Sequence, residues 1–522
     1  MFKIDRKRSA WLLIFLILAV VLRIYKLDLD SFWLDELYVA NEADPHHSLT
    51  QLFLALKSYD QHPPLFYLAE RCFFYFFGES EFSARVLPAA AGAASIFAIY
   101  LLGREVASDR LGWTAAALTV VNHFHIHYSR EARGYAFAFL FGTLSLVYLL
   151  RLLKHLRLQD VWLFSLFGLL TMYSHYFGVL LVLGEFCAAM LLFARENEKP
   201  LFVRRFALSA LLITAGYWPW LPVFLSLGAI RAFWINPLPG DWPIRYFGHY
   251  FGDFPGLAWC MAALLAVYLT GVLLRRRTGW PHADRSALTR SLVALGVPTL
   301  LCYTIPYFRG LIVTPMLTER YTIVVLPCLL IFVAYGIQLI PWVRARGIVL
   351  GLLIGTSLAG ELFISETWSK PHKTQFREVT AFMAADPNAN HYPILCERVG
   401  GPEAYYLHKM HYPGPLLEGP RASVIDSIAK DPLPAGQSNG FWLMDAHSAG
   451  DPGKWLDSAT RKKVDSEFVK VKEGRFLDAW AQLYVRRPSA TGATHHSAFI
   501  RNFTPYANLL SFPDAILPAA YP

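Results

Sequence analysis

Long apolar stretches separated by short polar and basic loops occupy the first two thirds of the chain. Eleven of them are long enough to cross a hydrocarbon core of about 30 Å as helices. They lie near residues 10–27, 83–103, 111–127, 133–150, 158–174, 176–194, 206–226, 256–274, 288–306, 321–340 and 346–363. The pattern predicts an α-helical polytopic membrane domain over residues 1–363, with about 11–13 transmembrane helices.

The basic loops predict how this domain is oriented. Lys and Arg gather in six clusters: Lys3 to Arg8, Arg104 to Arg110, Arg151 to Arg157, Arg195 to Arg205, Arg275 to Arg290 and Arg344 to Arg346. Because cytoplasmic loops carry an excess of Lys and Arg, we place all six in the cytoplasm. The N-terminus is then inside, and the loop 28–82 and the chain after Phe363 are outside.

Residues 62–78 do not fit this alternation of inner and outer loops. The stretch is apolar but contains Glu70 and Arg71, and a full crossing here would turn every later basic cluster outward. We therefore expect a short helix that lies partly in the membrane on the outer side. The alternative is an ordinary span with a compensating change elsewhere.

After Phe363 the pattern changes to short amphipathic pieces. Phe376, Val379, Phe382 and Met383 recur at helical spacing, residues 392–397 and 440–446 resemble strands, and residues 403–410 resemble a helix. Alternating strands and helices predict a small extracytoplasmic α/β domain at 364–486. Residues 487–522 are rich in Ser, Thr, Pro and Ala without periodicity, and we expect an irregular tail.

Composition supports the membrane assignment. Hydrophobic residues make up 55% of the 522 residues, and charged residues make up 17%, against roughly 25% in soluble domains. The formal charge of +9 comes from Lys and Arg in the short basic loops, and some of these residues are expected to meet anionic lipid headgroups. No nucleic-acid motif is present. The six cysteines include no Cys-x-x-Cys pair, so neither a zinc site nor a disulfide framework is indicated.

The first outer loop, 28–82, carries the leading candidate for catalysis. Asp35 and Glu36 are adjacent and flanked by Trp33, Leu34 and Leu37 at the membrane surface. Partial burial there favours a carboxylate acting as a general base. The alternative is a solvated acidic pair without a catalytic role.

Several basic and aromatic residues at the outer ends of spans are candidates for binding a phosphate. They are His62 before Pro63-Pro64, Arg130 and Arg133 at helical i, i+3 spacing, His175 between two apolar runs, and Arg320 with Tyr321. An arginine fork matches phosphate oxygens. Structural histidines and Arg–Glu pairs are the alternatives. His123, His125 and His127 invite a zinc interpretation, but the turn lies between helices and we assign no metal site.

With these residues placed, the chain resembles the GT-C glycosyltransferases, in the branch that includes dolichyl-phosphate-mannose protein mannosyltransferases and the bacterial aminoarabinose transferase of lipid A. The resemblance covers roughly residues 10–420. The motifs that carry it are WLDE at 33–36, HPPLFYL at 62–68, G-x-S-x-F-S-x-R-x-x-P at 78–88, HYSREARGY at 127–135, SHY at 174–176 and ERYTIVVLPCLLIFVAYGI at 319–337.

This resemblance implies a GT-C fold and a reaction at the outer face of a bacterial cytoplasmic (inner) membrane. A sugar passes from a polyprenyl-phosphate donor to a lipid, glycan or protein acceptor, with inversion at the anomeric carbon. Asp35 matches the acidic residue that serves the acceptor, Glu36 has a supporting position, and the 127–135 turn lies near the donor. Such chemistry requires no cofactor, and participation of a divalent metal is left open. Membrane lipids are the other expected partners.

Departures from the family leave the acceptor open. The 227–256 loop is too short for a β-trefoil insert, and the lipid A branch has Lys-Pro where His62-Pro63 stands here. The outer turn lacks the Asp-x-Asp of an oligosaccharyltransferase catalytic subunit, and the tail has no WWD-type acceptor motif. The alternative function is a lipid-glycan transporter or flippase without transferase activity. A transporter would show charges or broken helices at mid-membrane, often in two related halves, whereas here the polar residues gather at the outer ends.

Overall fold

The structure is a computed structural model that describes residues 6–58, 60–194, 196–230, 235–252, 255–274, 285–397, 402–419, 423–424, 439–447 and 449–487. The predicted irregular tail therefore lies outside the described residues, apart from Arg487. The chain divides into two compact units. Unit 1 comprises Met1–Leu27 and Val39–Ser369, and unit 2 comprises Asp28–Tyr38 and Lys370–Tyr521.

Unit 1 is helical. Its helices are α1 (Arg6–Ile24), α3 (Leu49–Ser58), α4 (Leu65–Phe77), α5 (Glu81–Val106), α6 (Asp109–Val120), α7 (His123–Ser129), α8 (Tyr135–His155), α9 (Leu158–Ser174), α10 (Phe177–Phe193), α11 (Lys199–Tyr217), α12 (Leu221–Ser226), α13 (Trp242–Phe251), α14 (Pro255–Leu274), α15 (Arg285–Ile312), α16 (Leu326–Leu339) and α17 (Val343–Phe363), with 3-10 turns η1 (Leu227–Ala229) and η2 (Glu319–Val325). Helix α2 (Leu34–Glu42) begins in unit 2 and continues into unit 1.

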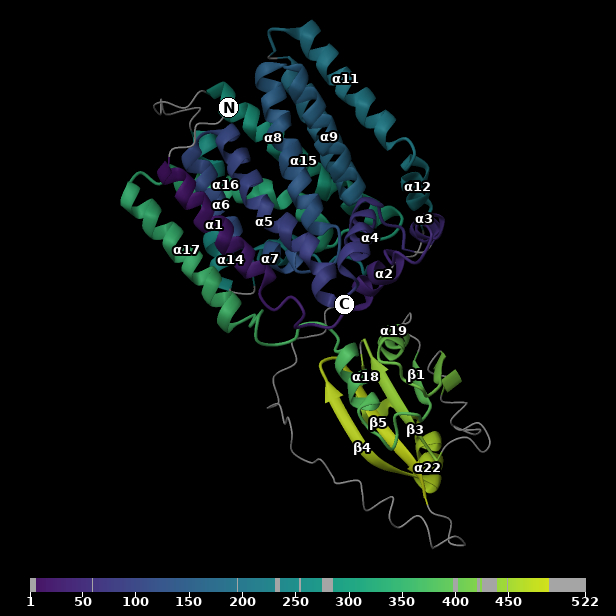
Figure 1. Cartoon of the computed structure of the whole chain (residues 1–522). Coiled ribbons are helices and arrows are strands. Elements are labelled where there is room, and N and C mark those ends of the chain that lie inside the picture. Colours follow the sequence, from purple (N-terminus) through teal and green to yellow (C-terminus); the bar gives the residue numbers. More distant parts are fainter. Residues whose placement is uncertain are drawn as a thin grey trace. The chain divides into compact units, whose positions relative to one another are not determined.

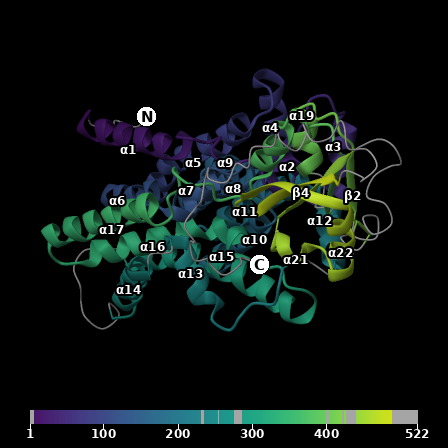
Figure 2. The same ribbon diagram turned by 90° about the horizontal axis from the view of Figure 1, so that it is seen from below.

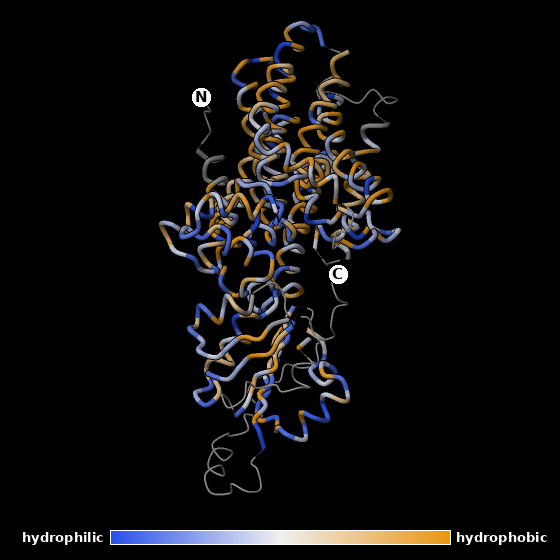
Figure 3. The backbone as a smooth tube through the Cα atoms, turned by 90° about the vertical axis from the view of Figure 1, so that its right-hand side faces the viewer, coloured by the Kyte–Doolittle hydropathy of each residue, from blue (hydrophilic) through white to orange (hydrophobic). Residues whose placement is uncertain are grey.

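The described helices confirm a polytopic membrane protein. Five segments are long and apolar enough to cross a membrane: Glu81–Val106, Tyr135–His155, Thr289–Ile312, Glu319–Leu339 and Val343–Phe363. Counting the bent pair Trp242–Phe251 and Gly256–Gly271 as one span gives up to six. Apolar residues recur along these helices (Figure 3). A helix is found in each of the eleven predicted stretches, while the number of crossings stays a prediction.

Two predicted spans differ from the structure. The stretch 111–127 is divided between α6, which ends at Val120, and α7. Asn122 starts the second helix as its N-cap, since its side chain accepts from the His125 amide at 2.9 Å. The stretch predicted at 206–226 is divided between α11, which starts at Lys199 and ends at Tyr217, and α12. Pro219 follows that end, and a proline does not continue a helix.

Helix α4 lies in the stretch 62–78, which did not fit the predicted alternation of inner and outer loops. It has 13 residues and is therefore about 20 Å long, shorter than a hydrocarbon core. Its charged residues are used inside unit 1: Glu70 is fully buried, and Arg71 donates to the backbone carbonyls of Asp44, Pro45 and His47. These features favour the expected short helix over a complete crossing.

Helix α5 is central to unit 1. It packs against α1, α4, α6, α7 and α8 (Figure 1). On another side of the unit, α14, α16 and α17 contact one another and lie side by side in Figures 1 and 2. Helix α17 is the least covered of the long apolar segments, with 11% of its apolar window buried, so most of its surface is available to lipid.

Unit 2 is a five-stranded sheet with helices. Its elements are α18 (Phe376–Ala384), β1 (Ile394–Glu397), α19 (Pro402–Lys409), β2 (Leu416–Gly419), β3 (Gly440–Ala446), α21 (Pro452–Trp455), α22 (Ser458–Glu467), β4 (Phe468–Phe476) and β5 (Ala479–Arg486). The strand order is β2-β1-β3-β5-β4. Strands β2, β1 and β3 are parallel, and β5 and β4 pair antiparallel. The predicted α/β domain is confirmed.

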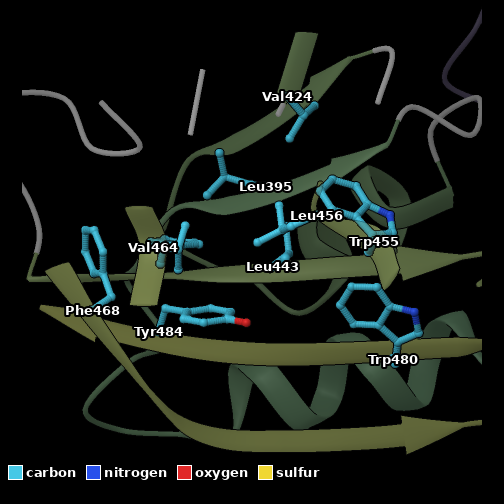
Figure 4. Packing of buried hydrophobic residues seen from close by; sticks show 10 residues of the cluster. Leu395, Val424, Leu443, Trp455, Leu456, Val464, Phe468, Trp480 and Tyr484 are labelled. Atoms are coloured by element: carbon cyan, nitrogen blue, oxygen red, sulfur yellow. The ribbon is translucent and has the colours of Figure 1, made fainter. Parts of the chain in front are cut away.

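The core of unit 2 forms on the apolar residues of β3 and β5. Strand β3 is buried along its whole length, and Phe441 stacks on Tyr484 of β5 with ring centroids 5.2 Å apart. Trp455 and Trp480 meet edge to face at 6.2 Å (Figure 4). The predicted helix at Phe376 is α18, and its apolar face is buried.

Candidate functional site

A small pocket in unit 1 brings together three of the predicted motifs. Its lining residues come from the loop before α4, the bend between α7 and α8, and the junction of α9 and α10; they are His62, Pro63, Phe66, Tyr67, Arg133, Gly134, Tyr135, Ser174 and His175. The open space is about 260 Å³, its mouth included. This volume includes open solvent, so it does not set the size of a ligand.

A glycine allows the bend and the helix junction to meet. A Cβ on Gly134 would lie 2.6 Å from the carbonyl oxygen of Ser174, which is closer than any side chain tolerates. Gly134 also precedes α8 at its N-cap, with an ordinary backbone φ of −69°. The close approach, rather than an unusual backbone angle, is therefore what requires glycine at this position.

His62 is oriented by the loop that precedes α4. Its Nδ1 lies 2.6 Å from the carbonyl oxygen and 3.1 Å from the carboxylate of Asp60. Since a carbonyl oxygen only accepts, Nδ1 carries a proton and is the ring nitrogen that binds Asp60, while Nε2 is not used in these two contacts. Prolines 63 and 64 then lead into α4, whose N-cap is Pro64.

Asp60 is the anchor of a buried polar network that sequence reasoning missed. Its carboxylate accepts from the Tyr67 hydroxyl and lies 3.5 Å from Nη1 of Arg133, which also donates to the Tyr67 hydroxyl. Burial alone would raise the pKa of Asp60, but the charges of His62 and Arg133 and the hydrogen bonds from His62 and Tyr67 outweigh it. They hold that pKa well below its usual range, so Asp60 is ionised.

His175 supplies a different kind of group to the same pocket. Its Nδ1 accepts from the backbone amide of Phe177 at 3.2 Å, so the neutral ring carries its proton on Nε2. Burial, followed by the nearby charges of His62, Arg320 and Arg133, lowers the pKa of His175 to about 3. A neutral N–H donor is thus maintained among cations.

Tyr321 and Arg320 approach the pocket from η2. The Tyr321 ring lies 5.0 Å from the His175 ring, centroid to centroid, and the Arg320 guanidinium lies 5.7 Å from the Tyr321 ring centroid. Arg320 also acts electrostatically on His175. Four of the predicted phosphate-binding positions, His62, Arg133, His175 and Arg320, therefore influence one small region.

Arg130 lies apart from that group. Its guanidinium donates to the carbonyl oxygens of Arg23, Tyr25 and Lys26 at 2.8–3.2 Å, at the end of α1, and it does not line the pocket. The expected i, i+3 pairing with Arg133 is wrong in its geometry, because α7 ends at Ser129 and residues 130–134 form a bend instead of a helix. A phosphate-binding role for Arg130 stays a prediction.

The three histidines of the 122–135 turn have separate partners. His123 pairs with Glu361 of α17 at 2.5 Å, and the buried His125 contacts Arg23 of α1 at 2.7 Å. His127 lies 3.8 Å from Glu131. Within the described part of the chain, no group of three or more His, Cys, Asp or Glu side chains could hold a metal ion.

Asp35 and Glu36 lie in the first turn of α2, in the part of that helix that belongs to unit 2. Carboxylates at a helix N-terminus also stabilise the helix through its dipole. Asp35 is half-buried, while Glu36 is fully buried and pairs with Lys373 at 3.1 Å. The two neighbours thus have different environments, which agrees with different roles.

Asp60 and Tyr67 belong to the polar network around Arg133 and were absent from the predicted set. Tyr67 falls inside the HPPLFYL motif, and Asp60 stands two residues before His62. An acidic residue beside a candidate cation was the available signal. The sequence holds no local sign of its pairing with Arg133, which is 73 positions away.

Comparison with known proteins identifies the family segment and the fold. Residues 61–220 match the family described as dolichyl-phosphate-mannose-protein mannosyltransferase, and no curated protein sequence matches the chain significantly. The structure of ArnT from Cupriavidus metallidurans in the apo state aligns with a TM-score of 0.59 at 12% identity, over 91% of this chain and 98% of that one. ArnT bound to undecaprenyl phosphate aligns with a TM-score of 0.54 at 13% identity, with the same coverage.

The matched family segment contains the residues of the pocket. It begins at residue 61 and ends at residue 220, a range that includes every lining residue from His62 to His175. At 12–13% identity, the solved structures establish the fold. The chain therefore has the GT-C fold, which confirms the sequence-based expectation of a multi-pass membrane protein of this fold, and residues 61–220 are similar to the mannosyltransferase family.

Proposed function

We propose that this protein transfers a sugar from a polyprenyl-phosphate donor to an acceptor on the extracytoplasmic face of a bacterial cytoplasmic membrane. The observation that carries the proposal is the pocket lined by His62, Arg133 and His175. It combines the cationic guanidinium of Arg133 with the neutral N–H donor of His175. ArnT, which shares the fold, binds undecaprenyl phosphate, and this chemistry supports the donor class.

The pocket residues have complementary tasks in this reaction. Arg133 presents a fork of N–H donors to phosphate oxygens, and the Nε2–H of His175 offers a hydrogen bond without adding charge. Asp60 neutralises part of the positive charge and fixes the directions of His62 and Arg133. Preorganised donors of this kind stabilise the negative charge that develops on a departing phosphate.

The group transfer is an in-line displacement. The acceptor hydroxyl oxygen forms a bond to the anomeric carbon while the bond from that carbon to the phosphate oxygen breaks. The bonding electrons leave with the polyprenyl phosphate, and the acceptor proton passes to a carboxylate base. Attack from the side opposite the phosphate inverts the anomeric centre.

We assign the base role to Asp35 and a supporting role to Glu36. Asp35 retains partial exposure, as a group that exchanges a proton with a substrate requires. Glu36 is fully buried and paired with Lys373, so it is suited to holding the turn rather than to receiving a proton. The reaction needs no cofactor in this scheme.

The test separates donor binding from transfer. Full-length protein in lipid nanodiscs is titrated with undecaprenyl phosphate, and transfer is followed with a radiolabelled polyprenyl-phosphate sugar and cell-envelope lipid and glycan fractions. For Asp35→Asn we expect unchanged binding and a loss of transfer of roughly 10²- to 10⁴-fold, the usual contribution of a general base. Equal transfer by Asp35→Asn and wild type would remove Asp35 from the base role. Absence of both binding and transfer in the wild type would overturn the proposed function.

A further inference from the structure

The segment that carries Asp35 is held by the C-terminal chain. Residues 28–31 form backbone and side-chain hydrogen bonds with residues 372–377: Asp30 accepts from the amides of His372 and Lys373, Ser31 Oγ donates to the Thr374 carbonyl, and Arg377 donates to the carbonyls of Asp28 and Leu29, at 2.6–3.2 Å. This is the chain immediately before and at the start of α18. The contacts explain why Asp28–Tyr38 groups with unit 2.

A second element fixes the same segment from α19. The backbone amide of Phe32 donates to the hydroxyl of Tyr406 at 2.7 Å, and the Phe32 ring packs edge to face on Tyr405, with centroids 5.9 Å apart. Phe32 and Tyr406 are both buried. The backbone leading into the first turn of α2 is therefore fixed by two separate parts of unit 2.

Lys373 contacts the residues on both sides of Asp35. Its Nζ lies 3.1 Å from Oε1 of Glu36 and 5.7 Å from the ring centroid of Trp33. The Glu36 side chain is 0% exposed and that of Lys373 is 11% exposed. The two opposite charges stabilise each other at this depth, because removing one partner of a buried pair is strongly destabilising.

We propose that Lys373 is a positioning residue for the transfer reaction, acting through Glu36 and Trp33 on the carboxylate of Asp35. Successive residues of a helix are rotated by about 100° about its axis, so fixing the direction of Glu36 also fixes that of Asp35. Unit 2, to which Asp35 and Lys373 both belong, then holds the base in position. This inference rests on the proposed function, and in particular on Asp35 as the base.

A purely stabilising ion pair would explain the same contacts, so the experiment must separate stability from positioning. Lys373→Met removes the cation of the pair and keeps the buried Glu36 carboxylate, whereas the double variant Glu36→Gln/Lys373→Met removes both charges. Lys373→Arg keeps the charge. Lys472 is a matched control, since it also pairs with a carboxylate (Asp386, 3.1 Å) and covers a ring (Phe382, 4.6 Å) within unit 2.

The measurements are kcat of sugar transfer, affinity for undecaprenyl phosphate, thermal stability, and hydrogen exchange of the amides of residues 31–42. In Lys373→Met we expect faster exchange, unchanged affinity, and a kcat lower by roughly 10- to 100-fold, as for a displaced catalytic group. The double variant should regain thermal stability and keep the low kcat. Lys373→Arg should restore part of kcat, and Lys472→Met should transfer at the wild-type rate.

Two results would contradict positioning by Lys373. One is a wild-type kcat in Lys373→Met; the other is full recovery of kcat in the double variant, which would assign the effect to stability. Failure of the proposed function has a different signature: the wild type transfers no sugar from the donors tested. In that case hydrogen exchange still tests whether Lys373 holds the segment that carries Asp35. Unchanged exchange at residues 31–42 in Lys373→Met would show that it does not.

Discussion

The guanidinium of Arg133 lies 3.5 Å from the carboxylate of Asp60, and both side chains are only 4% exposed. Two opposite charges are thus buried together beside a pocket that also contains His62 and His175. The arrangement supplies a positive site for an anion while keeping the buried charge partly compensated. It also means that the anion site and its stability depend on the same residues.

Loss of the Asp60 carboxylate should be costly. In Asp60→Asn the buried Arg133 keeps its charge while the Asp60 charge is lost, and we expect a loss of about 3 kcal/mol of stability, as for other broken buried pairs. Asp241→Asn is the control, since the Asp241–Arg245 pair is 52% and 61% exposed and such pairs contribute at most about 1 kcal/mol. Thermal and denaturant unfolding in detergent measure both. Equal effects of the two variants would show that Asp60 does not compensate Arg133.

The two arginines of the 127–135 motif should behave differently. Arg133→Gln is expected to weaken binding of undecaprenyl phosphate by roughly 10- to 100-fold, since hydrogen bonds to a charged group contribute about 1.5–3 kcal/mol. Arg130→Gln loses hydrogen bonds to carbonyls at the end of α1 and should lower thermal stability with little change in affinity. Titration with the lipid phosphate, alongside thermal unfolding, distinguishes them. Weaker binding in Arg130→Gln alone would reverse the assignment.

Gly134→Ala should disturb the pocket through one methyl group. The added Cβ would lie 2.6 Å from the carbonyl oxygen of Ser174, so the bend and the α9–α10 junction must separate. We expect a loss of about 1–3 kcal/mol, typical of overpacking, together with weaker lipid-phosphate binding. Gly355→Ala is the control, because a Cβ there meets no atom within 4 Å. Unaltered stability and binding in Gly134→Ala would show that the close approach is dispensable.

Acid should destabilise the protein through His175. Because its pKa falls to about 3 on folding, the unfolded state binds the proton more tightly, and this group's contribution to stability is lost as pH decreases from about 6.5 towards 3. At pH 5 the loss is about 2 kcal/mol. His175→Gln should therefore show a smaller difference in thermal stability between pH 7.5 and pH 5 than the wild type. An identical pH dependence would mean that His175 is not held neutral.

The helices were predictable where the apolar pattern was continuous. Helix α9 has the predicted bounds 158–174, and β3 has the predicted bounds 440–446. Strands β4 and β5 went unrecognised for opposite reasons. β5 is buried on both faces and shows no alternation, while β4 is an edge strand rich in Lys and Glu.

The site was predictable as a set of motifs but only in part as a geometry. Sequence spacing suggested that Arg130 and Arg133 share a helix face. Because residues 130–134 form a bend, Arg130 instead binds a carbonyl at the end of α1 and Arg133 binds Asp60. The role of Lys373 could not be foreseen either, because it depends on pairing with Glu36 more than 300 residues earlier.

The sequence by itself determined the membrane helices, the α/β unit and the polar motifs at span ends, because periodicity and composition are local properties of the chain. Only the tertiary structure decided that Asp60 anchors Arg133 and that residues 28–38 belong with the C-terminal unit. Both depend on ion pairs and hydrogen bonds between residues distant in sequence. Their formation is favoured only when folding removes the partners from water together, a condition that no local pattern records.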